Sequence, residues 1–197
     1  MGDRQLLLIN DRRDIVHYPI ATITSLTYAL KQLGEKMDRE RDILFLALSS
    51  HGSAGPLLSV TNGTVSLEQL TGKELREALD KSGIKRKIIV ISACHAGAFI
   101  PVLSDSNSVI ITAAAAEKTS FGCSDDRDLT YFGEAFYRDA LPKAGDLRSA
   151  FEGAKRAIGL REQLENQIAS DPQAYFGSDL VSILKKYPMT GPMAASH

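Results

Sequence analysis

Two residues of this sequence, Cys94 and His51, could do nucleophilic chemistry together. Cys94 follows the apolar run 88–93, and His51 follows the run 43–48 and two serines. A free thiol, with a pKa of about 8.5, is only a few per cent thiolate at neutral pH, so an adjacent imidazole is the expected activator. We therefore expect Cys94 to be the nucleophile and His51 its general base and later acid.

The residues beside these two extend the hypothesis. Gly52 lets the backbone approach a substrate carbonyl closely because it has no side chain. We expect the N–H groups of Gly52 and Cys94 to form an oxyanion hole, in which each donor contributes about 3 to 4 kcal/mol. His95 is expected to contact substrate rather than act as the base, because adjacent residues that leave a strand usually diverge.

Structural roles compete with this chemistry. A lone cysteine after an apolar strand is more often a small buried hydrophobe, and His-Gly is common in turns. The joint arrangement, in which both residues come after strands, favours catalysis. Metal binding by His51, His95, Cys94 and Cys123 is another alternative, but the paired spacing of zinc ligands is missing. We expect no metal or organic cofactor, and we expect Cys123 to be a structural loop thiol.

The elements that must position these residues alternate between strands and helices. We predict strands over 5–10, 43–48, 88–93 and 108–113, a β-hairpin over 57–67 around Asn62-Gly63, and helices over 22–36, 71–82, 129–140 and 146–169. This order indicates one α/β domain with a mostly parallel sheet covered on both faces. Sites in such sheets form at the carboxyl ends of the strands, so neighbouring strands would bring the imidazole and the thiol to one edge.

Composition excludes several classes of protein. The 197 residues are 44% hydrophobic and 24% charged, which is typical of a globular domain rather than a disordered, collagen-like or coiled-coil chain. The net charge of -1 leaves no basic field for nucleic acid. The apolar runs are far shorter than the roughly 20 residues that span a bilayer, and the N-terminus lacks a signal-peptide pattern. As the chain stands, we expect a cytoplasmic protein without a membrane span.

The sequence resembles the legumain, or asparaginyl endopeptidase, family of cysteine peptidases, whose fold is that of the caspases. The likeness is nearest to the short bacterial members. It is carried by blocks that follow one another in the family's order, at 44–53, 90–97, 111–115, 119–123, 129–134 and 172–177. The resemblance implies a three-layer α/β/α caspase-like fold with a peptide or protein as substrate.

The same resemblance implies a specificity pocket. Ser120 and Glu134 fall where family members line the primary pocket, and an acid partnered with a basic residue suits an asparagine or aspartate side chain. The resemblance also implies that Cys94 and His51 are the catalytic dyad and that Gly52 belongs to the oxyanion hole. Further expected substrate-binding residues are Ser92, His95 and Asp125.

The sequence departs from the family at three points. His95 replaces the acidic residue that commonly follows the cysteine. We also expect the family's C-terminal inhibitory domain to be missing. The family's first strand and helix, with the Asn that orients the histidine, are expected before Gln5; any signal or anchor would lie there too. We therefore expect one peptidase domain over 1–184, a flexible tail over 185–197, and an exposed sheet region that favours a homodimer.

The sequence thus predicts a cysteine endopeptidase that cleaves after Asn or Asp through an acyl-enzyme. Three alternatives stay open. A transamidase or ligase would use the same dyad with an amine in place of water. An Arg- or Lys-specific peptidase would use Asp125, Asp126 and Glu134 as an acidic pocket. An inactive binding or regulatory domain would keep the fold alone.

Overall fold

The structure, a computed structural model, describes residues 5–10, 16–62, 65–122 and 129–186. Its strands form a four-stranded sheet in the order β1-β5-β6-β7 and a three-stranded sheet in the order β2-β3-β4. The strands are β1 (Leu44–Ser49), β2 (Gly52–Ser53), β3 (Leu57–Asn62), β4 (Val65–Thr71), β5 (Lys87–Ser92), β6 (Ser108–Thr112) and β7 (Gln173–Phe176). The helices are α1 (Ile23–Lys36), α2 (Gly72–Ser82), η1 (Ala96–Phe99), α3 (Ile100–Leu103), α4 (Tyr131–Gly133), η2 (Glu134–Ala140), η3 (Leu141–Lys143), α5 (Leu147–Leu164) and α6 (Ser178–Leu184).

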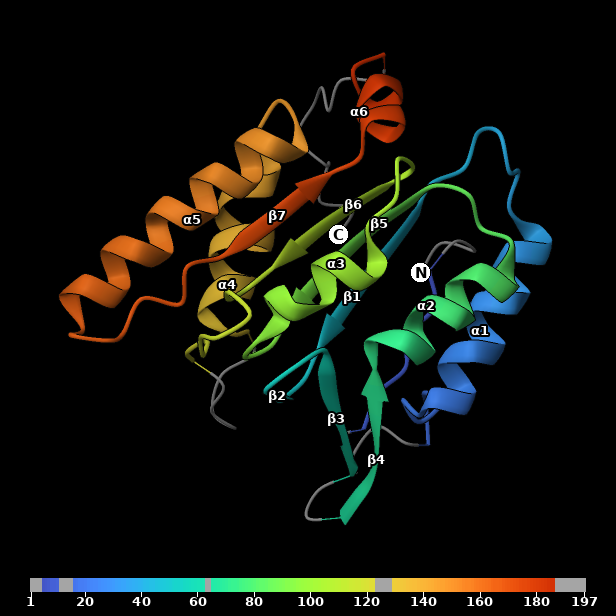
Figure 1. Cartoon of the computed structure of the whole chain (residues 1–197), viewed down its shortest axis with the longest axis horizontal. Coiled ribbons are helices and arrows are strands. Elements are labelled where there is room, and N and C mark those ends of the chain that lie inside the picture. The colour runs from blue at the N-terminus through green and yellow to red at the C-terminus, as the bar shows by residue number, and fades with distance from the viewer. Residues whose placement is uncertain (1–4, 11–15, 63–64, 123–128, 187–197) are drawn as a thin grey trace.

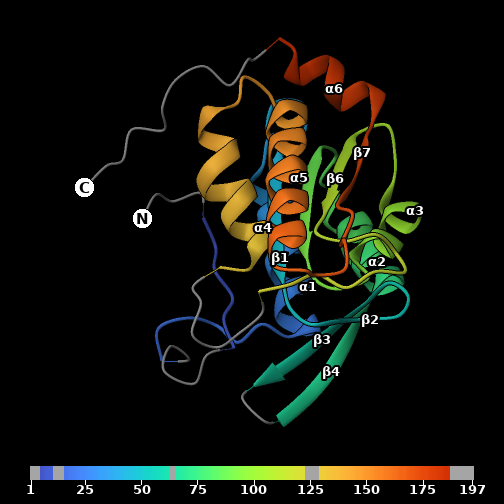
Figure 2. The ribbon, with the colours of Figure 1, turned by 90° about the vertical axis from the view of Figure 1, so that its left-hand side faces the viewer.

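The larger sheet is mostly parallel and lies between two layers of helices. β1, β5 and β6 run parallel, and β7 pairs antiparallel with β6. Figure 2 shows α4 and α5 on one side of this sheet and α2 and α3 on the other. The smaller antiparallel sheet projects beyond the end of β1 (Figure 1). This is the three-layer α/β/α architecture that the sequence predicts.

Local sequence explains where α1 begins and where α2 begins and ends. The Thr22 side chain accepts a hydrogen bond from the Ser25 N–H and caps α1. At α2, Thr71 and Glu74 form a capping box, and Gly83 ends the helix in the left-handed conformation at φ 69°. These caps confirm the predicted starts of both helices.

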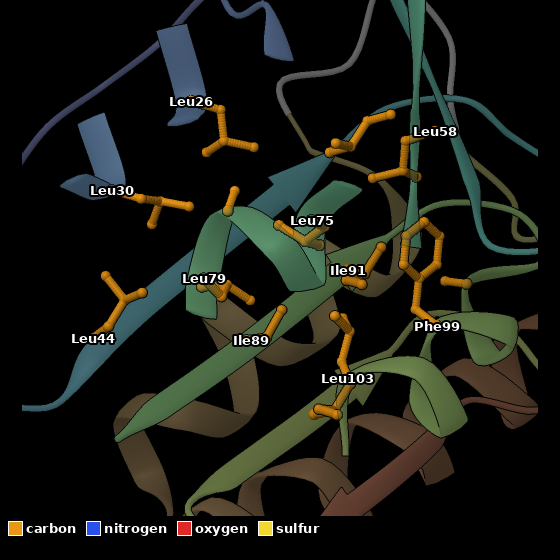
Figure 3. Packing of buried hydrophobic residues seen from close by; sticks show 14 of the residues in the cluster. Leu26, Leu30, Leu44, Leu58, Leu75, Leu79, Ile89, Ile91, Phe99 and Leu103 are labelled. Carbon is orange, nitrogen blue, oxygen red and sulfur yellow. The ribbon is translucent and has the colours of Figure 1, made fainter. Parts of the chain in front are cut away.

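Two apolar clusters fill the space between the layers. Every residue of β5 is buried, with alternate side chains on opposite faces, as expected for a central parallel strand. The first cluster joins Ile89 and Ile91 to α1, α2 and α3 (Figure 3). The second joins Ile88 and Val90 to η2, α5 and α6. The sheet is thus held from both sides, which fixes the ends of β1 and β5.

The helices on the side of α4 and α5 differ from the prediction in type and length. The helix predicted over 129–140 is a short α-turn followed by a π-helix, η2, and Thr130 caps its start. The helix predicted to reach 169 ends at Leu164, and Asn166 then adopts a positive φ of 52°. A π-helix widens the turn, a feature that often occurs near functional sites.

The prediction of a strand at 5–10 is wrong. Its residues form no ladder, and the side chains of Leu6 and Leu7 are 48% and 39% exposed. The Ile9 N–H donates to the Pro19 carbonyl, but a strand needs a continuous partner, and none lies beside 5–8 in the described part of the chain. The prediction also missed β2 and β7, which are too short to show a periodic pattern. The predicted hairpin is present as β3 and β4, with Gly63 of its turn outside the described residues.

Candidate active site

The strand register brings His51 and Cys94 to equivalent positions. β1 and β5 pair from Leu44 with Lys87 to Ser49 with Ser92, and the Ser50 N–H then donates to the Ser92 carbonyl at 3.2 Å. His51 and Cys94 follow with the same offset, each two residues beyond the last pair. The predicted base and nucleophile therefore lie at the same end of two adjacent parallel strands.

The thiol of Cys94 is half-buried against Ser120. The Ser120 N–H donates to Sγ at 3.3 Å, and the thiol can donate to the Ser120 carbonyl at 3.6 Å. The hydroxyl of Ser120 lies 3.9 Å from Sγ. These contacts hold Sγ against the loop that follows β6. In the described residues Sγ has no hydrogen bond to His51, and such contacts often tighten only when substrate binds.

Gly52 packs directly against the backbone of Cys94. A Cβ at Gly52 would lie 2.0 Å from the Cys94 carbonyl oxygen, so only glycine fits. The Ser59 N–H donates to the His51 carbonyl, which makes the next residue, Gly52, a non-hydrogen-bonded position opposite Leu58. Its N–H therefore points away from β3. The N–H of Cys94 has no acceptor among the described residues, so both predicted oxyanion donors are unengaged.

His95 turns the chain sharply after the thiol. It adopts the left-handed conformation, with φ 58° and ψ 13°. Its N–H donates to the Lys118 carbonyl at 2.8 Å, and its Nδ1 lies 2.9 Å from the Ala116 carbonyl oxygen. Gly97 then packs against 114–116, where a Cβ would lie 2.7 Å from the Ala116 nitrogen. His95 thus ties the loop after β5 to the loop after β6.

Ser92 and Glu134 are both engaged with other side chains. Ser92 is 4% exposed, and its hydroxyl lies 2.8 Å from the Thr130 hydroxyl. Glu134 lies one helical turn after Thr130, and its Oε2 accepts from Arg161 Nη1 at 2.8 Å. Its other oxygen, Oε1, lies 3.2 Å from Arg138 Nη2. The acid predicted for the specificity pocket therefore has basic partners within the structure.

The sequence of this domain matches one family along most of its length. A model of the peptidase C13 family matches residues 20–180, which include the end of β1, the end of β5 and Glu134. The chain belongs to the peptidase C13 family. Members of this family, to which legumain belongs, are cysteine peptidases, and the fold described above is the caspase-like one that the resemblance implies. No curated protein matches the chain.

Solved caspase structures share the fold of this C13 chain. A crystal structure of caspase-1 from Spodoptera frugiperda superposes with a TM-score of 0.57 at 17% identity, covering 81% of this chain and 69% of that one. A structure of pro-sf-caspase-1 superposes with a TM-score of 0.56 at 16% identity, covering 81% of this chain and 73% of that one. At these identities the likeness shows a common fold.

Some of the predicted residues of this C13 chain lie outside the described ranges. Cys123 and Asp125 belong to 123–128, outside the described residues. No group of three potential metal ligands occurs in the described ranges. None of the helices described is long and apolar enough to cross a membrane. In the described residues the free thiol is that of Cys94.

Sequence reasoning missed two contributions to this C13 site. The first is the Ser120 N–H on Sγ, since a backbone donor leaves no trace in residue types. The second is Arg161 from α5, which lies 27 positions from Glu134 in sequence. From sequence alone, an arginine in a long helix is expected to be a solvated surface residue. The packing of α5 on η2 is what brings Arg161 to Glu134.

Proposed function

We propose that this protein is a cysteine endopeptidase that hydrolyses peptide bonds after Asn or Asp, with Cys94 as nucleophile and His51 as base. Membership of the C13 family supports the cysteine-peptidase class. The observation that carries the proposal is the equivalent position of His51 and Cys94 beyond the paired ends of β1 and β5. The contact of the Ser120 N–H with Sγ adds to it, because it fixes the position of the proposed nucleophile.

The chemistry proceeds in two halves. His51 removes the thiol proton, and Sγ of Cys94 attacks the carbonyl carbon of the scissile bond. The oxygen of the tetrahedral intermediate carries the negative charge and accepts from the N–H groups of Gly52 and Cys94. The C–N bond breaks as His51 protonates the leaving amine, which leaves a thioester on Cys94. His51 then deprotonates water, which attacks the thioester and releases the carboxylic acid and the thiol.

The side chain before the scissile bond is recognised by Ser120 and Glu134 in this proposal. Glu134 is a carboxylate acceptor for an amide NH₂, and Ser120 offers a hydroxyl that donates or accepts. Because basic side chains lie beside Glu134, the pocket is not a bare acid that favours Arg or Lys. This charge balance supports Asn or Asp over the basic alternative.

The test uses the full chain with Cys94→Ala and, as the matched control, Cys123→Ala. Fluorogenic peptides that differ only in ending with Asn, Asp or Arg are incubated with each protein, and an acyloxymethyl ketone is used to label reactive thiols. We expect cleavage after Asn or Asp and labelling in the wild type and Cys123→Ala. Both should disappear in Cys94→Ala.

The same assay separates the alternatives. Unchanged cleavage by Cys94→Ala would contradict the nucleophile, and faster cleavage after Arg would contradict the specificity. Product masses measured with an added amine distinguish hydrolysis from amide transfer. An unlabelled wild type that cleaves none of the peptides would favour the binding-domain alternative and overturn the proposal.

We also propose that a second copy of this chain covers the open edge of β1. In the described residues no strand pairs with the outer side of β1, which carries no charged residue to guard it. A cleft of about 1000 Å³ lies there, between 5–8, α1 and β1. The rim segment 6–9 is itself apolar and lacks a strand partner in the described residues. Each copy thus offers both an apolar cleft and an apolar segment, so exchange would form a closed two-fold dimer.

Light scattering at several concentrations tests this dimer. We expect a dimer for the wild type and a shift toward monomer for Leu7→Asp, which places a charge on the cleft rim. Leu164→Asp is the control, because Leu164 is an exposed apolar residue at the end of α5. A wild-type monomer at all concentrations would contradict the interface.

A further inference from the structure

Arg161 is held more firmly than an arginine on a helix surface usually is. Its Nη1 lies 2.8 Å from Glu134 Oε2, and its Nε lies 2.9 Å from Glu165 Oε1. Its guanidinium carbon lies 3.4 Å from the centre of the Tyr131 ring. The Arg161 side chain is 33% exposed and that of Glu134 is 19% exposed, so the pair is partly shielded from water. Stacking and two carboxylate contacts together fix the plane of the guanidinium.

Tyr131 and Glu165 complete this arrangement. The Tyr131 hydroxyl donates to Glu165 Oε2 at 2.6 Å, so one carboxylate contacts both the ring that supports Arg161 and Arg161 itself. The hydrogen bond to Glu165 raises the pKa of Arg161 above its ordinary value, and the hydrogen bond to Glu134 adds to the rise. Arg161 is therefore a permanent positive charge at a fixed position beside Glu134.

The same helix start is tied to the segments that contact the thiol. The Tyr131 N–H donates to the Phe121 carbonyl, next to Ser120. Thr130 lies 2.8 Å from the hydroxyl of Ser92, two residues before Cys94. Glu134 is one turn further along, and its N–H donates to the Thr130 carbonyl. A change in how Arg161 holds Glu134 is therefore a change close to the residues around Cys94.

We propose that Arg161 is a positioning residue that sets the substrate preference of this site through Glu134. This inference rests on the proposed function, in which Glu134 faces the substrate side chain. With Arg161 in place, the Glu134 carboxylate is oriented and its charge is balanced, so the pocket accepts an uncharged amide or an acid. Without Arg161, Glu134 loses the partner that orients it, and the contact with Arg138, whose side chain is 60% exposed, is screened by water. The pocket then carries one positive charge fewer, so it accepts Arg or Lys better than the wild type does.

The experiment compares Arg161→Gln, Arg161→Lys and the control Arg156→Gln, which removes an exposed arginine of the same helix. The value of kcat/KM is measured for peptides that differ only in ending with Asn, Asp or Arg. We expect Arg161→Gln to shift the ratio of Asn to Arg cleavage by about three- to fivefold toward Arg, as loss of a partly exposed charge partner implies. Arg161→Lys keeps the positive charge but loses the planar guanidinium that contacts both Glu134 and Glu165. Its ratio should therefore lie between those of the wild type and Arg161→Gln. Arg156→Gln should keep the wild-type ratio.

Labelling of Cys94 by the acyloxymethyl ketone and thermal unfolding are followed in every variant. A structural role alone would lower all three rates together and leave the ratio unchanged, and that result would overturn the inference while the proposed function stands. If Arg161→Gln does not fold, Arg161→Lys and Glu165→Gln test the inference instead. Each weakens the contacts that hold the Arg161 guanidinium in place, so each should shift the ratio in the same direction. A wild type that cleaves none of the peptides would overturn both proposals.

Discussion

A methyl group on Gly52 would lie 2.0 Å from the carbonyl oxygen of Cys94, so the backbones of these two residues are in direct contact. This contact places the residue after His51 against the residue that carries the thiol. It also shows why the proposed oxyanion donors come from these two N–H groups, because they belong to segments packed on each other.

Gly52→Ala should therefore abolish most activity. The added Cβ must push the two segments apart, and the loss of one aligned oxyanion donor alone costs about a hundredfold or more in kcat. The measurement is kcat on an Asn peptide together with thermal unfolding. Gly145→Ala is the control, because nothing lies within 4 Å of a Cβ built there. Wild-type kcat in Gly52→Ala would contradict the proposed oxyanion hole.

Ser120→Ala should distinguish the role of the Ser120 N–H from the role of its hydroxyl. The N–H that contacts Sγ at 3.3 Å remains, so the rate of Cys94 alkylation by a small reagent should stay within about twofold of the wild type. Cleavage after Asn should fall about five- to tenfold, the value of one neutral hydrogen bond to substrate. A large drop in alkylation with unchanged peptide specificity would instead assign the hydroxyl to the thiol.

His95 should be sensitive to the shape of its replacement. Its φ of 58° suits Gly and Asn but strains a β-branched residue by roughly 1 to 2 kcal/mol. In urea denaturation, His95→Val should be less stable than the wild type by about this amount, and His95→Asn should be close to it. If His95→Val were as stable as His95→Asn, the left-handed turn after Cys94 would be wrong.

Asp146 should make the stability of α5 depend on pH. Its Oδ1 accepts from the Ser149 N–H at 2.7 Å, and this hydrogen bond holds the pKa of Asp146 below its ordinary value. A carboxyl with a lowered pKa stabilises the fold above its unfolded pKa and loses that effect as pH falls through its folded pKa. Asp146→Ala should cost about 1 kcal/mol at pH 7, and the difference from wild type should shrink between about pH 5 and pH 2. A difference that is constant with pH would contradict the charged cap.

The elements that hold the proposed dyad were predictable because their signals are local. The capping box at Thr71 and Glu74, the apolar runs of β1, β5 and β6, and the Asn62-Gly63 hairpin are all visible within a few residues of sequence. The sequence could not predict that β1 and β5 are adjacent, because strand pairing depends on tertiary contacts. The apolar run at 5–10 misled the prediction, because its composition is that of a strand while the described structure gives it no partner.

The surroundings of the proposed site depend on contacts between distant segments. Arg161 reaches Glu134 from another helix, and Ser120 reaches the thiol from another loop. Neither spacing has a periodicity that a sequence pattern reports. The π-helix that begins at Glu134 is likewise set by packing against α5, since its residues alone are compatible with an ordinary α-helix.

The parallel pairing of β1 with β5 also decides which parts of this sequence are free to change in length. The ladder, rather than the number of residues in between, aligns the ends of β1 and β5, from which His51 and Cys94 follow. Residues added at the turn between β3 and β4 leave that alignment intact. A single residue added within β5 would move the cysteine one position along the strand and rotate its side chain to the other face. Natural or engineered variants should therefore tolerate insertions in the hairpin and lose activity from any insertion between Lys87 and Cys94.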